Sequence, residues 1–179
     1  MLSSIANDSS TTSRSSLDSI VRKIARDIDR FLSTGDVAEL RRLRPEDPSS
    51  PAFWKMIAYR VEPGGVLASD GPKRDLQERR WAVLLAGMAE MKGLHATGRR
   101  LGSAVASAGV AESRFVRLLR AHDDGLLDAV RLIAHHLASA GEPVDWADLA
   151  RLVMSDGDTN EEAVRRGIAR DYYGTLSRT

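Results

Sequence analysis

Apolar residues recur at intervals of three and four along nearly all of this chain of 179 residues. This spacing places them on one side of an α-helix, which has about 3.6 residues per turn. The first row of this kind contains Leu17, Ile20, Val21, Ile24, Ile28 and Phe31. No segment shows the alternation of period two that is typical of a half-buried strand. The sequence therefore predicts an all-α fold, a compact bundle of about eight or nine helices.

The expected domain organisation is simple. Residues 1–16 are rich in serine and threonine, with too few apolar side chains to offset the entropy lost on ordering, so they predict a disordered tail. Residues 17–179 are expected to form a single all-α domain. Within it, glycines and prolines predict a long loop over residues 63–74, between a helix at 51–61 and one at 76–91.

Composition and charge exclude several classes of protein. There is no cysteine, which rules out disulfides and thiolate chemistry. No apolar run approaches the roughly 20 residues of a membrane helix, and no secretory leader is recognisable, so we expect a cytoplasmic protein. Lysine and arginine number 26 against 25 acidic residues, so any nucleic-acid-binding surface must come from segregation of charge.

The most informative stretch is Leu101–Arg120, in which a short apolar helix, a glycine turn and a second helix follow one another. On the second helix, apolar side chains and arginines fall on opposite faces. The arginine face contains Arg114, Arg117 and Arg120, and no acidic residue lies between the first and the last of them. Guanidinium groups one turn apart, about 5 Å, can contact successive phosphates.

Other arginines extend this predicted phosphate-binding surface. The full set of candidate nucleic-acid-binding residues is Arg79, Arg99, Arg100, Arg114, Arg117, Arg120 and Arg131. Such contacts bring affinity without sequence specificity. Most aromatic residues, including Phe31, Phe53 and Trp54, fall on apolar faces, so we expect phosphate contact to dominate over base stacking.

Two alternative interpretations of these residues remain open. The arginines can simply solvate the outer face of a helix, and Arg114 and Arg117 can instead pair with Glu112, Asp123 or Asp128 and fix the helix packing. The same stretch also fits a helix-turn-helix transcriptional regulator with Gly109 at the turn, although the predicted recognition helix begins with residues that are poor readers of base edges.

The sequence offers little for catalysis or for cofactor binding. It contains no phosphate-binding glycine loop, nucleophile elbow or zinc-binding helix motif. The neighbouring pairs His135–His136 and Asp123–Asp124 diverge by about 100° on a helix, so neither pair is expected to chelate a metal. We therefore expect no enzymatic activity, no cofactor, no metal and no small-molecule substrate.

Several motifs in a shared order resemble the CasB family, the small subunit of the type I-E CRISPR surveillance complex Cascade. They are LG-x-A at Leu101–Ala104, E-x-R-F-x-R-L-L at Glu112–Leu119, V-D-W-x-x-L-A at Val144–Ala150, A-R-D-Y-Y at Ala169–Tyr173 and the pair Phe53–Trp54. Together they extend over most of the predicted domain. The serine-rich segment has no counterpart among them.

The resemblance implies a non-catalytic all-α subunit, present in two copies in a ribonucleoprotein with CRISPR RNA. Its implied partners are target DNA, the backbone and large subunits of Cascade, and a second copy of itself. The family's basic surface holds the guide–target duplex and the displaced strand, which stabilises the R-loop. Through the E-x-R-F-x-R-L-L motif, the resemblance carries nucleic-acid contact to Arg114 and Arg117.

Overall fold

The fold was analysed in a computed structural model that describes the backbone of residues 5–178 and the side chains of residues 16–178. These residues form nine α-helices and no strand, which confirms the all-α prediction. The helices are α1 (Ile5–Arg30), α2 (Thr34–Arg41), α3 (Pro51–Met56), α4 (Gly71–Glu90), α5 (Leu101–Ser107), α6 (Glu112–Arg120), α7 (Asp123–Ala140), α8 (Trp146–Met154) and α9 (Glu161–Leu176).

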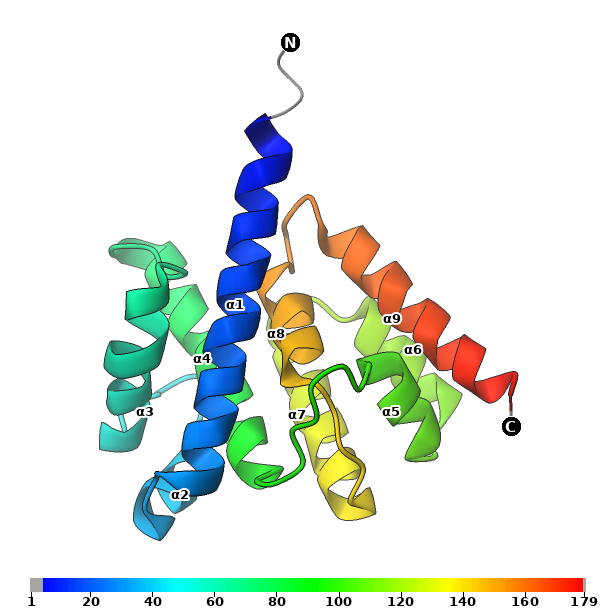
Figure 1. The fold of residues 1–179 in the computed structure, drawn as a ribbon, viewed down its shortest axis with the longest axis horizontal. Coiled ribbons are helices and arrows are strands. Elements are labelled where there is room, and N and C mark those ends of the chain that lie inside the picture. The colour runs from blue at the N-terminus through cyan, green and yellow to red at the C-terminus, as the bar shows by residue number, and fades with distance from the viewer. Residues whose placement is uncertain (1–4, 179) are drawn as a thin grey trace.

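Helix α1 lies across the front of the molecule, between α2–α4 on one side and α5–α9 on the other (Figure 1). It packs against α8 and α4, while α5 packs along α9. Helix α4 is buried on all sides from Arg80 to Ala89, because it contacts α2, α7 and α8. Its Gly87 lets α8 approach closely, since a Cβ there would lie 2.4 Å from the Trp146 ring. One core thus continues through both groups of helices.

The first helix begins earlier than the sequence predicts. It starts at Ile5 rather than near Leu17. No proline or glycine interrupts residues 5–30, and serine and threonine have only modestly unfavourable helix propensity, so nothing in the local sequence stops the helix. Residues 1–4 lie outside the described part of the chain. The division into a tail of residues 1–16 and a single domain of residues 17–179 stays a prediction.

The predicted loop at residues 63–74 is shorter in the structure. A π-helical turn over Ile57–Val61 and a 3₁₀ turn over Glu62–Gly64 extend α3, and α4 begins already at Gly71. The Gln77 side chain fastens the remaining loop, because its amide oxygen accepts from Ala68 N at 2.7 Å and its amide nitrogen donates to the Val66 carbonyl at 3.2 Å.

Two aromatic side chains do not lie where their helical periodicity placed them. Phe31 is 70% exposed and Trp54 is 44% exposed, whereas Phe53 is fully buried as predicted. Helix α1 ends at Arg30, so the chain leaves the helical path before Phe31 can follow the buried row of Ile24 and Ile28. The expectation that Phe31 and Trp54 lie on core faces is therefore wrong.

None of the helices in residues 5–178 combines the length and the apolar character that spanning a bilayer requires.

Candidate nucleic-acid interface

The predicted arginine face of α6 is present. Phe115 and Leu118 are buried, while Arg114, Arg117 and Arg120 are exposed. The Phe115 ring stacks on Tyr172 of α9, with ring centroids 3.7 Å apart and planes 13° from parallel. This contact fixes the rotation of α6 about its axis, so the arginines face away from the core.

The surroundings of these three arginines differ in detail. Arg114 contacts the Nε2 atom of His136 on α7. Within residues 16–178, Arg117 and Arg120 make no ion pair with a carboxylate. Arg131, on the exposed side of α7, also has no carboxylate partner in that part of the chain. The pairing with Glu112, Asp123 or Asp128 that the sequence left open is thus not formed by Arg117.

Arg99 and Arg100, by contrast, are held in place by acidic groups from distant parts of the chain. Arg99 Nε donates to Glu142 Oε1 at 3.0 Å, and Arg99 Nη2 donates to Ser107 Oγ at 2.9 Å. Arg100 pairs with Asp171 of α9 at 2.9 Å and with the buried Asp148 of α8 at 3.3 Å. The Arg100 guanidinium thus cross-links the start of α5 to α8 and α9, whereas Arg99 connects it to the loop between α7 and α8.

Arg79 belongs to the same class. Its Nη2 atom lies 2.6 Å from Asp124 Oδ1, so it connects α4 with the first turn of α7. The seven predicted residues therefore do not form one uniform track. Four lie on α6 and α7 without a carboxylate partner in the described residues, and three are engaged by carboxylates.

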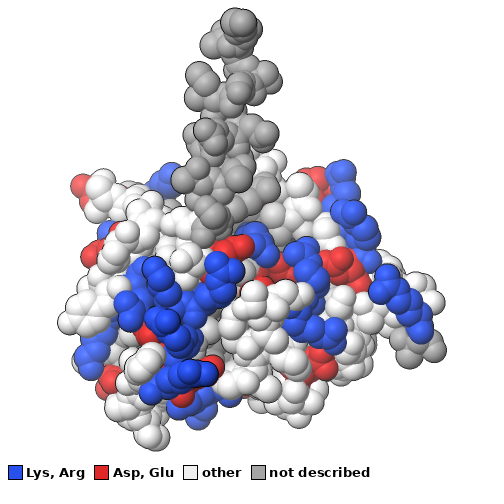
Figure 2. All heavy atoms as spheres, in the orientation of Figure 1, with Lys and Arg blue, Asp and Glu red and all other residues white. Residues whose placement is uncertain are grey.

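A further basic surface, on α1, was not among the sequence predictions. Arg22, Arg26 and Arg30 follow one another at intervals of four residues and are all exposed, with Lys23 exposed beside them. None of the four has an ion-pair partner within residues 16–178. Blue side chains gather over the lower half of α1 and beside it, whereas those over α5 and α8 are interspersed with red ones (Figure 2). We call Arg22, Arg26 and Arg30 the α1 row.

The acidic residues of α1 explain why the row escapes detection in the sequence. Asp18 is bound by Arg151 of α8 at 2.6 Å, and Asp27 is buried and paired with Arg60. Asp29 accepts from Gly93 N at 2.8 Å. Each of these three carboxylates is engaged by another element, so the exposed side of α1 over residues 16–30 is more cationic than its sequence indicates. The four-residue spacing of the arginines was the signal that could have identified it.

The predicted helix-turn-helix pair exists as a helix pair, but α9 lies against both members. Gly109 adopts φ +68° at the turn. A Cβ on Gly102 of α5 would lie 2.2 Å from the Ile168 carbonyl oxygen of α9. Tyr173 Oη donates to Glu112 Oε1 at 2.7 Å, so α9 also contacts the first residue of the would-be recognition helix. The glycine turn therefore joins two helices that both pack against α9.

The two neighbouring histidines, which were not expected to share a metal, contact different residues. His135 Nδ1 lies 2.7 Å from Glu90 Oε1 on α4, while His136 faces Arg114 on α6. Divergence on the helix explains this arrangement.

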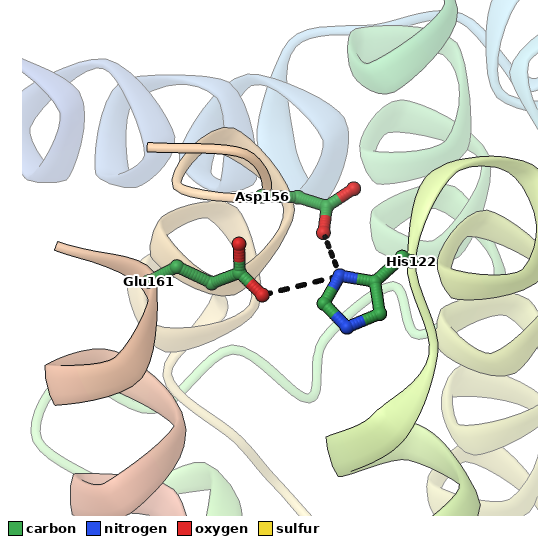
Figure 3. A group of neighbouring side chains, drawn as sticks. All are labelled: His122, Asp156 and Glu161. Atoms are coloured by element: carbon green, nitrogen blue, oxygen red, sulfur yellow. Dashed lines mark hydrogen bonds and ion pairs between the residues drawn. The ribbon is translucent and has the colours of Figure 1, made fainter. Parts of the chain in front are cut away.

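A cluster that the sequence did not suggest brings together His122, Asp156 and Glu161, whose ligand atoms lie within 4.8 Å of one another (Figure 3). His122 Nδ1 is 3.0 Å from Asp156 Oδ1 and 3.2 Å from Glu161 Oε1. Arg165 already occupies both carboxylates, since it lies 3.1 Å from Asp156 Oδ1 and 2.8 Å from Glu161 Oε1. Asp156 Oδ2 also accepts from Asp123 N at 2.8 Å.

This cluster therefore functions as an ion-pair network. A second guanidinium, that of Arg80, lies 3.5 Å from Asp156 Oδ2. Two cations beside the carboxylates disfavour a metal ion in their midst. The network joins the α6–α7 connection to the loop between α8 and α9 and thus supports the base of the arginine-bearing helix α6.

The chain matches a known protein family. The family model for "CRISPR-associated protein Cse2" matches residues 36–173. Comparison with curated protein sequences gave no significant match.

The chain is also similar to solved structures. A chain of E. coli Cascade bound to a PAM-containing dsDNA target has a TM-score of 0.63 at 22% identity, with 88% of this chain and 97% of that chain covered. CasB from M. ruber gives 0.65 at 18% identity, covering 89% and 95%. CasB from Thermobifida fusca gives 0.68 at 20% identity, covering 90% and 98%. The fold is shared throughout, and on the family match the chain belongs to the CRISPR-associated protein Cse2 family.

Proposed function

We propose that the chain is a non-catalytic, nucleic-acid-binding subunit of a Cascade-type CRISPR surveillance complex. In this role it holds the displaced DNA strand and the guide–target duplex, and so stabilises the R-loop during antiviral defence. Its partners would be CRISPR RNA, target DNA, the backbone and large subunits and a second copy of itself, in the cytoplasm. Membership of the Cse2 family and the likeness to a chain of E. coli Cascade bound to dsDNA support the assembly.

The observation that carries the nucleic-acid role is the set of exposed arginines without carboxylate partners in the described residues. They are Arg117 and Arg120 on α6, Arg131 on α7 and the α1 row, with Arg114 beside them. Each can donate to a phosphate without first breaking an ion pair. R-loop formation is close to balanced in free energy, so a few such contacts can decide whether the opened DNA persists.

Arg79, Arg99 and Arg100 stay candidates of a second kind. Each would have to leave a carboxylate to reach a phosphate, or share its donors between the two. We therefore expect them to contribute less to binding than the unpaired arginines. A transcriptional regulator is the less favoured alternative, because α9 covers part of the helix pair that such a protein would insert into DNA.

The test uses Arg117→Glu/Arg120→Glu in the complex reconstituted with CRISPR RNA and the other subunits. We expect R-loop formation on a matched duplex to weaken by on the order of tenfold. The dependence of log affinity on log salt should become shallower by about 0.7 to 0.9 for each lost phosphate contact. Both residues are on an exposed face, so the melting temperature should be unchanged.

Lys55→Glu/Arg166→Glu is the matched control. It makes the same change in net charge, but both cations already pair with carboxylates, Asp36 and Glu162. The proposal fails if the two double variants weaken R-loop formation equally, or if neither does. If the wild-type protein stays bound to the other subunits in the absence of DNA but Arg117→Glu/Arg120→Glu does not, these two arginines serve subunit assembly instead.

A further inference from the structure

Two large aromatic side chains are exposed and line the same groove beside the α1 row. Phe31, just after α1, is 70% exposed, and Tyr59, in the π-helical turn, is 67% exposed. The groove has a volume of about 460 Å³ and is lined by Arg26, Asp27, Phe31, Leu32, Met56, Tyr59 and Arg60. Its size lies within the range of sites that hold small organic groups.

Local backbone geometry turns both rings outward. Phe31 N and Leu32 N both donate to the Asp27 carbonyl, at 2.9 and 2.8 Å, so α1 closes in a wide last turn. Tyr59 lies in a π-helical turn, which inserts an extra residue relative to the α-helical path and so rotates the side chains that follow. Exposing two rings of this size gives up the free energy of their burial, about 2 kcal/mol for a phenylalanine.

The charge at the groove has a single sign on its exposed part. Arg26 is exposed and unpaired within residues 16–178, and Arg30 precedes Phe31 in the chain. The only acidic lining residue, Asp27, is 4% exposed and is paired with Arg60. An acidic peptide or a phosphate would be attracted, but only a ligand with flat π faces also makes full use of two exposed rings.

We propose that Phe31 and Tyr59 form a stacking platform for an unpaired base of single-stranded nucleic acid, with Arg26 binding the adjacent phosphate. The inference rests on the proposed function and deepens it, since it names a base-contacting site and favours the displaced single strand over the duplex at this position. Stacking on aromatic rings is tolerant of sequence, because every base has a π face. A paired base inside a duplex cannot use the platform.

The test measures binding of the full chain, by fluorescence anisotropy at low salt, to an oligothymidylate and to an abasic oligonucleotide of equal length. The wild-type chain should bind the thymidylate at least about fivefold more tightly, a difference of about 1 kcal/mol. Phe31→Leu/Tyr59→Leu keeps apolar side chains but removes both rings. We expect it to abolish that preference while leaving affinity for the abasic strand and its salt dependence unchanged.

Trp54→Leu is the matched control, because Trp54 is also exposed in α3 but does not line the groove. It should retain the preference for thymidylate. Thermal unfolding of all three proteins checks that exposed-site substitutions leave the fold intact.

The outcomes separate the two proposals. Equal binding of both oligonucleotides by the wild-type chain, with a clear salt dependence, would overturn the platform but leave the phosphate contacts standing. A preference for thymidylate that survives in Phe31→Leu/Tyr59→Leu would also overturn it, because the bases would then have to contact side chains other than these two rings. Absence of salt-dependent binding to either strand would contradict the proposed function itself.

Discussion

The α1 row and the Arg99–Arg100 pair contain the same functional group in opposite surroundings. Arg26 has no carboxylate partner in residues 16–178 and borders an open groove. Arg100 lies between Asp148 and Asp171 and joins three helices. The sequence suggests the opposite pairing, because acidic residues are close to Arg26 along the chain and none is close to Arg100. Neighbours along the chain therefore say little about which charges meet in the fold.

The largest effect that separates the two regions is expected for Asp148→Ala. Asp148 is 3% exposed, accepts from Leu101 N at 2.9 Å and faces Arg100 and Arg151. Removing the Asp148 carboxylate leaves its buried polar partners without a hydrogen-bond acceptor. We therefore expect the free energy of unfolding to fall by about 3 kcal/mol. For a chain of this size the melting temperature should fall by roughly 6 to 12 °C in a thermal unfolding experiment.

Asp171→Ala provides the matched control for that prediction. Asp171 pairs with the same Arg100 side chain but is partly exposed, and its loss should cost less than about 1 kcal/mol. Equal destabilisation by the two variants would mean that Arg100, rather than the buried carboxylate, organises this junction.

An intermediate effect is expected when the two kinds of arginine are neutralised in the same way. Arg26→Gln should lower the affinity of the full chain for single-stranded DNA by about fivefold, with a stability change within about 0.5 kcal/mol. Arg100→Gln should do the reverse, lowering stability by up to about 1 kcal/mol and affinity by less than about twofold. Salt-dependent binding titrations and chemical unfolding of both variants measure the comparison.

A result in which Arg100→Gln weakens DNA binding as much as Arg26→Gln would break the distinction. It would indicate that the ion pairs of Arg100 open when nucleic acid binds.

The smallest expected effect is a dependence of stability on pH that arises from His95, a residue close to Arg22 of the α1 row and a few positions before Arg99 in the chain. Burial lowers the pKa of His95, and Arg22 of the α1 row adds to this, whereas Asp145 and Asp29 oppose it. The unfolded chain therefore binds more protons than the folded chain as pH falls through about 6.5 towards the lower pKa of the folded state. Stability should decrease over that interval and be fully present above it.

His95→Gln should remove this part of the pH dependence, as measured by the melting temperature between pH 5 and pH 8. In Arg22→Gln the same dependence should become weaker, because one of the charges that disfavour protonated His95 is gone. An unchanged pH profile in His95→Gln would assign the dependence to another group.

Much of the fold could be predicted because helical periodicity is a local property. The amphipathic character of α6 follows from the spacing of Phe115 and Leu118 against Arg114 and Arg117, and the structure places them as predicted. The N-cap of α8 is equally local, because Asp145 accepts from Ala147 N at 3.0 Å, only two residues along the chain. The start of α1 and the exposure of Phe31 could not be predicted, because the periodicity of apolar residues does not define the residue at which a helix begins or ends.

The candidate site was less predictable for a different reason. The sequence proposed seven arginines as phosphate ligands. Whether each of them is paired with a carboxylate depends on residues far away in the chain, such as Glu142 for Arg99 and Asp124 for Arg79. The α1 row is hard to recognise in the sequence because Asp18, Asp27 and Asp29 are interspersed with its arginines. Charge pairing at these positions is a property of contacts between elements.

The sequence by itself determined that this chain forms a bundle of amphipathic helices with an arginine face on α6, because the spacing of apolar and charged residues along one helix decides which side can be buried. Only the tertiary structure decided which arginines stay unpaired and which aromatic rings remain exposed. The physical reason is that electrostatic pairing and burial depend on distances in space, so a guanidinium becomes available to a phosphate only where packing has taken every nearby carboxylate elsewhere.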